Sequence, residues 1–342
     1  MSRSFEGLAW LLLAFVFIGL GACASPSANE VEVEEWVEVT LEPGSSFGAV
    51  TDTLESHGLV GQPRLFQAYA RLRGDDRRVR AGTYRLPASA RWSDLLDALV
   101  EGRIVTVSMT IPEGFTLQQI VPRIAAVTEL EEAAVRGRVV GENRHEEWGV
   151  PGPGLEGYLF PDTYRFAPGV ELDSLVHALV SRYQDFWSPE RRNSAEKLGM
   201  SEGEVVTLAS IVEAEARHAS ELEIIASVFH NRLRIGMPLQ ADPTVQYALG
   251  ERQSRLLYTH IDEVADHPYN TYTQPGLPPG PIGAPGEAAL LATLNPADTP
   301  YLYFVARPDG SHVFTRTLSE HNRARVQVRR EWDALDTGTE PR

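Results

Sequence analysis

The segment Leu208–Ala216 constrains the fold most, because its pattern predicts an apolar helix that carries two carboxylates. With about 100° of rotation per residue, four apolar positions share one side of this helix. They are Val205, Leu208, Ile211 and Val212. Glu215 lies roughly 50° from the centre of this stripe and Glu213 roughly 110° away. Glu215 is therefore expected at the buried edge, where loss of water raises the pKa of a carboxyl group. A glutamic acid that is protonated near neutral pH suits cleavage of an acetal or glycoside.

The surroundings of the two glutamates in the sequence differ. Glu213 has Arg217 four residues further on, which predicts an exposed ion pair on the helix. Glu215 has no basic residue at Ile211 or Ala219, the neighbouring positions on its own face. The pattern favours Glu215 as the catalytic acid, with Glu213 as the reserve. A purely structural role is the alternative for either residue.

Composition excludes several classes of function. The chain has 342 residues, enough for two or three domains, and a net charge of −16, which disfavours nucleic acid as a partner. The only lysine, Lys197, lies in a charged stretch, so a Schiff-base cofactor is not expected. The segment His145–Gly149 lacks the second histidine of a zinc helix, and there is no cysteine pair. We therefore expect neither a metal nor a cofactor.

The N-terminus has the pattern of an export or anchoring signal. Leu8 to Leu20 is almost wholly apolar, and it leads to Cys23, the only cysteine of the chain. Residues 1–23 therefore predict either a signal peptide with a lipobox, lipidated at Cys23, or an uncleaved membrane anchor. Residues 24–36 predict a linker. In both cases the body of the protein is expected outside the cytoplasm and tethered to a membrane.

The next region, residues 37–150, contains a partial repeat. Thr40, Leu41, Gly44, Phe47, Val50 and Leu54 match Thr110, Ile111, Gly114, Leu117, Ile120 and Ile124 seventy positions later. Each set predicts a strand, a glycine turn and a capped helix. Such small α+β units resemble LysM-type modules, which bind the glycan of bacterial cell walls. An ordinary packing module is the alternative.

The turn Pro151–Gly154 predicts a boundary, after which residues 151–332 form a second domain and residues 333–342 a tail. Helices are expected at 172–187, around Glu215, at 221–233 and at 319–332. Residues 242–300, rich in proline and glycine, predict mostly ordered loop. A β-hairpin is expected from 301–306 and 312–315. The predicted fold class is α+β.

Eight blocks in this second region resemble the YceG-like family of endolytic murein transglycosylases. They are residues 155–164, 208–215, 228–233, 237–244, 269–272, 276–280, 300–305 and 321–322. The resemblance implies a lysozyme-like catalytic region with one essential glutamate. It also implies cleavage of peptidoglycan between N-acetylmuramic acid and N-acetylglucosamine, leaving 1,6-anhydro ends. Lytic transglycosylases place this glutamate before a small residue, as Glu215 precedes Ala216. The resemblance further implies the inner membrane and, as partners, the peptidoglycan synthases.

A transglycosylase needs one carboxyl group, which acts first as acid and then as base, because the sugar's own 6-hydroxyl replaces water. Only Asp242, which also suits an Asp-Pro turn, rivals Glu215. The candidate substrate-binding residues are Gln240, Asp242, Thr244, Tyr247, Asn270, Tyr272, Gln274, Tyr158 and Tyr164. Two alternative functions stay open. One is a non-enzymatic wall-binding lipoprotein, and the other is a peptidoglycan hydrolase that uses water with Asp242 as its base.

Overall fold

The computed structural model describes residues 35–141, 144–251, 253 and 256–336, which form two compact units that divide after Glu101. The predicted signal or anchor with Cys23, most of the linker and the end of the tail lie outside the described residues. Within these ranges no helix is both long enough and apolar enough to cross a bilayer. The α+β fold class is confirmed.

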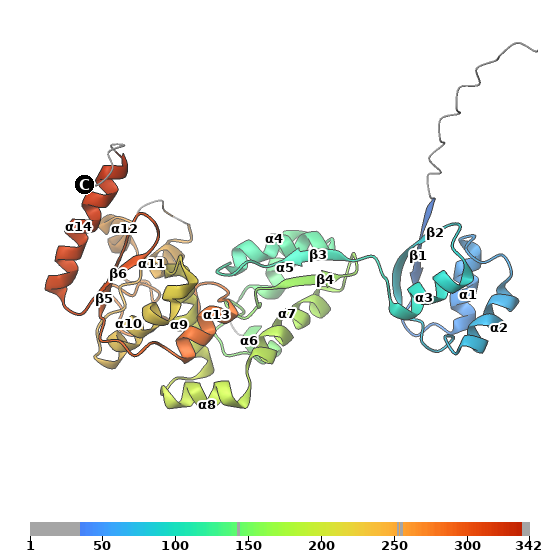
Figure 1. The fold of residues 1–342 in the computed structure, drawn as a ribbon, viewed down its shortest axis with the longest axis horizontal. Helices are drawn as coiled ribbons and strands as arrows, with labels where there is room; N and C mark the ends of the chain where they lie inside the picture. The colour runs from blue at the N-terminus through green and yellow to red at the C-terminus, as the bar shows by residue number, and fades with distance from the viewer. Residues whose placement is uncertain (1–34, 142–143, 252, 254–255, 337–342) are drawn as a thin grey trace, which may run out of the picture. The chain divides into compact units, whose positions relative to one another are not determined.

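The first unit is a two-stranded antiparallel ribbon packed with three helices (Figure 1). Its elements are β1 (Trp36–Leu41), α1 (Phe47–Ser56), α2 (Pro63–Arg73), β2 (Gly82–Pro87) and α3 (Trp92–Glu101). Ser46 caps α1 by accepting a bond from the Ala49 amide at 3.2 Å. Leu54, Phe66 and Tyr84 are fully buried between ribbon and helices, so apolar burial holds this small unit together.

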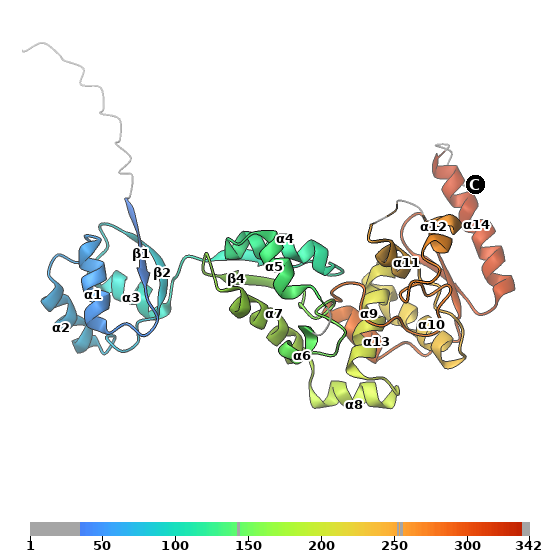
Figure 2. The ribbon, with the colours of Figure 1, turned by 180° about the vertical axis from the view of Figure 1, so that it is seen from behind.

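The second unit begins with another antiparallel ribbon. Its first elements are β3 (Val107–Thr110), α4 (Leu117–Thr128), α5 (Glu132–Val139), α6 (Arg144–Trp148), β4 (Thr163–Phe166) and α7 (Leu172–Phe186). The β3 and β4 strands pair, and helices α4 and α7, which can be followed beside this ribbon in Figures 1 and 2, contact each other. Because this pairing joins residues on both sides of position 150, the boundary predicted there falls inside the second unit. The structure divides the chain at Glu101 instead.

The remainder of the second unit is a helical body with a C-terminal hairpin. Its elements are α8 (Pro189–Lys197), α9 (Glu202–Glu215), η1 (Ala219–Glu221), α10 (Leu222–Arg234), α11 (Asp242–Leu249), α12 (Tyr258–Glu263), α13 (Glu287–Leu294), β5 (Tyr303–Ala306), β6 (His312–Thr315) and α14 (Leu318–Asp336). The predicted hairpin is confirmed as the antiparallel pair β5–β6. Helix α9 packs against α10, α11 and α13, and every residue from Val205 to Val212 is buried.

One local prediction was incomplete and another was wrong. The described residues of the region 242–300 are mostly loop, as predicted, but the region also contains the short helices α11, α12 and α13. Pro243 occupies the first turn of α11, where a missing amide hydrogen does no harm, so this proline starts a helix instead of breaking one. The predicted ion pair of Glu213 with Arg217 is not found among the described residues. Helix α9 ends at Glu215, so the two side chains do not share a helical face.

The partial repeat is confirmed and extends further than predicted. Both glycine turns have positive φ, 78° at Gly44 and 74° at Gly114. A threonine pair crosses each ribbon with Oγ1 atoms 3.0 Å apart, Thr40 with Thr83 and Thr110 with Thr163. The next residue in each second strand, Tyr84 or Tyr164, donates its hydroxyl to the carbonyl four residues earlier, at 2.6 and 2.7 Å. We call residues 36–87 the first copy and residues 107–166 the second copy.

Candidate catalytic site

Helix α9 delivers its two glutamates to the edge of the core. It starts with a capping box, in which the amide of Ser201 donates to Glu204 Oε2 at 2.7 Å and the Glu204 amide donates to Ser201 Oγ at 3.3 Å. The buried stretch that follows fixes the helix in the core. Glu213 and Glu215 are both partly exposed where the helix ends, so the core determines their positions.

Glu215 lies against the beginning of α11. The backbone amide of Asp242, the first residue of α11, hydrogen-bonds to its carboxyl group. Burial raises the pKa of Glu215 to about 8, and the negative charge of Asp242 adds to this shift. The charge of Arg232 and the Asp242 amide act in the opposite direction, but they are smaller effects. Glu215 therefore carries a proton at neutral pH while its side chain stays accessible.

Arg232 on α10 is the cation of this site, and the sequence analysis missed it. Its side chain is buried, with Nε donating to the Leu302 carbonyl at 2.7 Å and Nη1 donating to the Leu239 carbonyl. Its guanidinium lies 5.5 Å from the centre of the Tyr303 ring. These contacts hold a positive charge close enough to Glu215 to stabilise its carboxylate form. The only signal in the sequence was its place in the block 228–233.

Asp242 and Tyr272 form a second pair at the site. The Tyr272 hydroxyl donates to Asp242 Oδ1, and burial together with the Asp242 charge raises the pKa of Tyr272, which keeps the hydroxyl protonated. Asp242 is itself exposed. Nearby in sequence, exposed Gln240 has a left-handed φ of 49°, a conformation that is strained for a residue with a side chain. Three predicted residues, Gln240, Asp242 and Tyr272, are thus placed on the segments that adjoin Glu215.

Glu213 has different surroundings. Its Oε2 accepts a bond from the Gly286 amide at 3.2 Å, and Gly286 is the N-cap of α13. Burial, and secondarily the charge of Glu113, raise the pKa of Glu213. Its hydrogen bond therefore links α9 to the start of α13, whereas Glu215 is influenced by the charges of Arg232 and Asp242.

Glu156 is a further carboxylate with a shifted pKa, and the sequence analysis did not identify it. Its Oε1 and Oε2 accept from the Leu117 amide at 3.0 and 3.2 Å, and its Oε2 accepts from the Tyr247 hydroxyl at 3.2 Å. Burial raises the pKa of Glu156 to about 7 in spite of these bonds. Tyr247, a predicted substrate-binding residue, is thus engaged with a carboxylate.

The other predicted substrate-binding residues have mainly internal contacts. Thr244, Asn270 and Tyr158 are completely buried, so their side chains do not face solvent. Asn270 donates to the carbonyls of Ile261 and Val264, both at 3.0 Å, which orders the loop before Tyr272. Tyr164 and Gln274 are half-buried, and each donates to a main-chain carbonyl, of Phe160 and Ala265 respectively.

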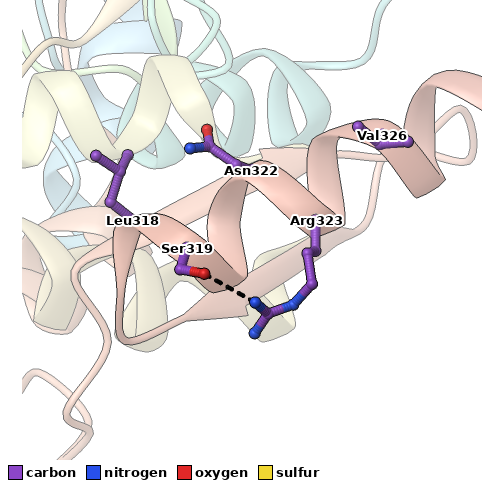
Figure 3. Close-up of a pocket in the computed structure, with 5 residues that line it drawn as sticks. All are labelled: Leu318, Ser319, Asn322, Arg323 and Val326. Atoms are coloured by element: carbon purple, nitrogen blue, oxygen red, sulfur yellow. Dashed lines mark hydrogen bonds between the residues drawn. The ribbon is translucent and has the colours of Figure 1, made fainter.

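A separate depression of about 630 Å³ lies on the surface of α14 (Figure 3). Its lining residues all belong to this one helix: Leu318, Ser319, Asn322, Arg323 and Val326. Arg323 is bonded to Ser319 at 2.8 Å, and no carboxylate lines the depression. It therefore lacks the groups of the Glu215 site. In the described part of the chain, no three His, Cys, Asp or Glu side chains are grouped to hold a metal.

Comparisons with known proteins agree with these observations. A model of the YceG-like family matches residues 39–327. An endolytic murein transglycosylase of Bacillus subtilis is 33% identical over 312 residues, 86% of each chain, and one of Streptococcus pneumoniae is 31% identical over 85% of this chain and 58% of its own length. The crystal structure of a yceG-like protein from Listeria monocytogenes aligns with a TM-score of 0.57 and 33% identity, covering 85% of this chain and 99% of that one. This chain belongs to the YceG-like family.

Proposed function

We propose that this protein is a lytic transglycosylase that cleaves peptidoglycan strands between N-acetylmuramic acid and N-acetylglucosamine, leaving 1,6-anhydro-N-acetylmuramic acid ends. The relatives named endolytic murein transglycosylase support the reaction class. The observation that carries the choice of residue is the protonated, accessible Glu215 beside the buried cation Arg232. Glu213, whose contact is with the start of α13, is the reserve.

The surroundings of Glu215 suit a group that must lose and then regain a proton. As an acid, Glu215 gives its proton to the glycosidic oxygen, and the bond to the leaving sugar breaks. The carboxylate that results is stabilised by Arg232 and by the Asp242 amide. It then takes the proton from the 6-hydroxyl of the muramic acid, whose oxygen attacks the anomeric carbon. The proton returns to Glu215, and no water is consumed.

Replacement of the acid tests this proposal. We expect Glu215→Gln to fold like wild type and to release anhydro-muropeptides from purified sacculi about 10²–10⁴-fold more slowly. Glu213→Gln is the matched control, because its amide oxygen can still accept from Gly286 and most activity is expected to remain. Mass spectrometry of the released fragments is the measurement. An active Glu215→Gln protein together with an inactive Glu213→Gln protein would transfer the acid role to Glu213.

One observation favours a second candidate, hydrolysis by water. Asp242 is an exposed carboxylate near Glu215, and an acid with a nearby carboxylate is the arrangement of a glycoside hydrolase. The two reactions leave different ends, since hydrolysis gives a free reducing end and adds the mass of one water. Asp242→Asn should stop hydrolysis outright, whereas a transglycosylase should keep anhydro product formation at a reduced rate.

We further propose that the first unit is a LysM-like wall-binding module. Its order of strand, two helices and strand, with the strands paired antiparallel, supports this proposal. Sedimentation of the inactive Glu215→Gln protein with sacculi measures wall binding without digestion. If the full chain binds sacculi but wild type releases no product, the alternative of a non-enzymatic wall-binding protein is correct. Tethering through the N-terminus, lipidation at Cys23 and association with peptidoglycan synthases stay predictions.

A further inference from the structure

The contacts of Glu156 join two parts of the second unit that are far apart in the sequence. Glu156 follows the core residue Leu155, and its carboxylate accepts from the Leu117 amide, which is the first amide of α4. The same carboxylate accepts from the Tyr247 hydroxyl on α11, 91 residues away. The Tyr247 ring packs against the ring of Tyr269, with centroids 4.8 Å apart. One carboxylate thus connects the second copy to α11.

Helix α11 leads from this contact to the catalytic acid. It begins at Asp242, whose backbone amide bonds to Glu215, and it carries Tyr247 in its second turn. A helix of eight residues is stiff, so a hydrogen bond that fixes Tyr247 also fixes the direction in which the Asp242 amide points. The position of Glu156 is therefore transmitted to the partner of Glu215.

The first copy has an acidic residue at the position that corresponds to Glu156, but no helix that corresponds to α11 lies against it in the described part of the chain. The match of the two copies continues through the turn before the second strand, where the Arg78 amide bonds to the Asp75 carbonyl at 2.9 Å and the Tyr158 amide bonds to the Leu155 carbonyl at 3.1 Å. By this correspondence Asp76 occupies the place of Glu156. Asp76 lines an open cleft of about 160 Å³ in the first unit. In the described part of the chain, Asp76 therefore has no hydrogen bond like the one between Glu156 and Tyr247, although both acids occupy the same place in the module.

We infer that Glu156 is a positioning residue, whose carboxylate holds α11 through Tyr247 so that the Asp242 amide faces Glu215. This inference rests on the proposed function, since it assigns a task within the same reaction. The carboxylate form accepts all of its bonds without competition from a proton of its own. Activity should therefore require Glu156 to be ionised.

The titration of Glu156 makes this requirement measurable. The Leu117 and Gly157 amides and the Tyr247 hydroxyl lower the pKa of Glu156, but burial raises it by more. The charge of Glu156 in turn raises the pKa of Tyr269. Because the pKa of Glu156 is raised to about 7 and that of Glu215 to about 8, the rate should rise as pH passes about 7 and fall as it passes about 8.

The experiment compares pH–rate profiles of the full chain on purified glycan strands. In Glu156→Gln we expect the rising limb near neutral pH to disappear and kcat to fall by about tenfold, less than the ~10²-fold that a 1 Å misplacement can produce. KM should change much less than kcat. Tyr247→Phe should remove the same limb, and the double variant should be no slower than either single variant, because both changes break one link. Asp76→Asn, the matched change in the first copy, should leave kcat and the limb unchanged.

Two outcomes separate this inference from the proposed function. A Glu156→Gln enzyme with wild-type kcat and an intact rising limb overturns the positioning role, even if Glu215→Gln is inactive. An active Glu215→Gln enzyme overturns the proposed acid instead. Should Glu156→Gln fail to fold, Tyr247→Phe decides, since it keeps the carboxylate and removes only a hydroxyl. A Tyr247→Phe profile identical to wild type then overturns the inference.

Discussion

The two copies of the strand–turn–helix module have the same internal construction but different neighbours. Each has a glycine turn, a threonine pair across its ribbon and a buried or half-buried tyrosine bonded to its own main chain. In the second copy the glycine turn pairs with another segment: the Gly114 amide donates to the Ala284 carbonyl at 2.7 Å, and the Ala284 amide donates to the Phe115 carbonyl at 2.8 Å. In the first copy the corresponding residues, Gly44 and Ser45, line the open cleft.

The difference lies in a few residues around the turn. Gly157 in the second copy packs directly against Pro281, while its counterpart in the first copy is the exposed Arg77. Gly283 comes so close to the Gly114 carbonyl that an added Cβ would lie 2.7 Å from its oxygen. The glycine turn, the threonine pair and the tyrosine thus specify the module in both copies. The glycines at positions 157 and 283 allow segment 281–284 to lie against the second copy. The second copy therefore packs against segment 281–284, whereas the corresponding turn of the first copy lines a cleft.

The largest expected effect on stability comes from placing the arginine of the first copy, Arg77, at the corresponding position of the second copy, Gly157. A Cβ at Gly157 would lie 2.4 Å from Pro281 Cβ, and φ there is 83°. Gly157→Arg should therefore lower the free energy of unfolding of the second unit by about 3 kcal/mol or more. The reverse change, Arg77→Gly, should lower that of the first unit by less than about 1 kcal/mol.

Native-state hydrogen exchange, which reports the two units separately, is the measurement for this pair of variants. Equal losses in the two units would contradict the view that a neighbour, rather than the module itself, requires glycine at position 157. A wild-type stability of Gly157→Arg would show that segment 281–284 does not lie against this turn in solution.

Local features of the two copies could be predicted from the sequence, whereas contacts between distant segments could not. Gly44 and Gly114 before apolar helices indicate turns and caps at short range, and these were confirmed. Glu215 could be placed at the end of a buried helix by its spacing alone. Arg232 is 17 residues away on another helix, and Glu156 reaches Tyr247 across 91 residues. No periodicity connects such positions, because packing of the whole unit brings them together.

The second expected effect is a loss of stability of the second unit as the pH rises. Folding raises the pKa of Glu156 to about 7 and that of Glu215 to about 8, from 4.5. The folded state then binds more protons than the unfolded state between these values, so the free energy of unfolding falls as pH rises from about 5 to about 8. Partial exposure of both groups limits the loss to on the order of 2 kcal/mol for each.

Hydrogen exchange of the second unit, corrected for the intrinsic pH dependence of exchange, measures this loss. Glu156→Gln and Glu215→Gln should each flatten the pH dependence, since neither variant can ionise at that position. Asp76→Asn is the control in the first copy and should leave the pH dependence of the second unit as it is. A second unit whose stability rises between pH 5 and pH 8 would mean that neither carboxyl group is buried as the structure places it.

The smallest effect tests what the two copies share. An added methyl group at Gly44 would have nothing within 4 Å, and one at Gly114 would meet only Glu213 Cγ at 3.8 Å, an ordinary contact. Both glycines have φ near 75°, so Gly44→Ala and Gly114→Ala should each lower the free energy of unfolding of their own unit by about 1 kcal/mol. Alanine keeps the amide that Gly114 donates to Ala284, so the neighbouring segment stays bound. A much larger loss for Gly114→Ala would show that the turn itself, and not only the residues around it, was adapted to the catalytic unit.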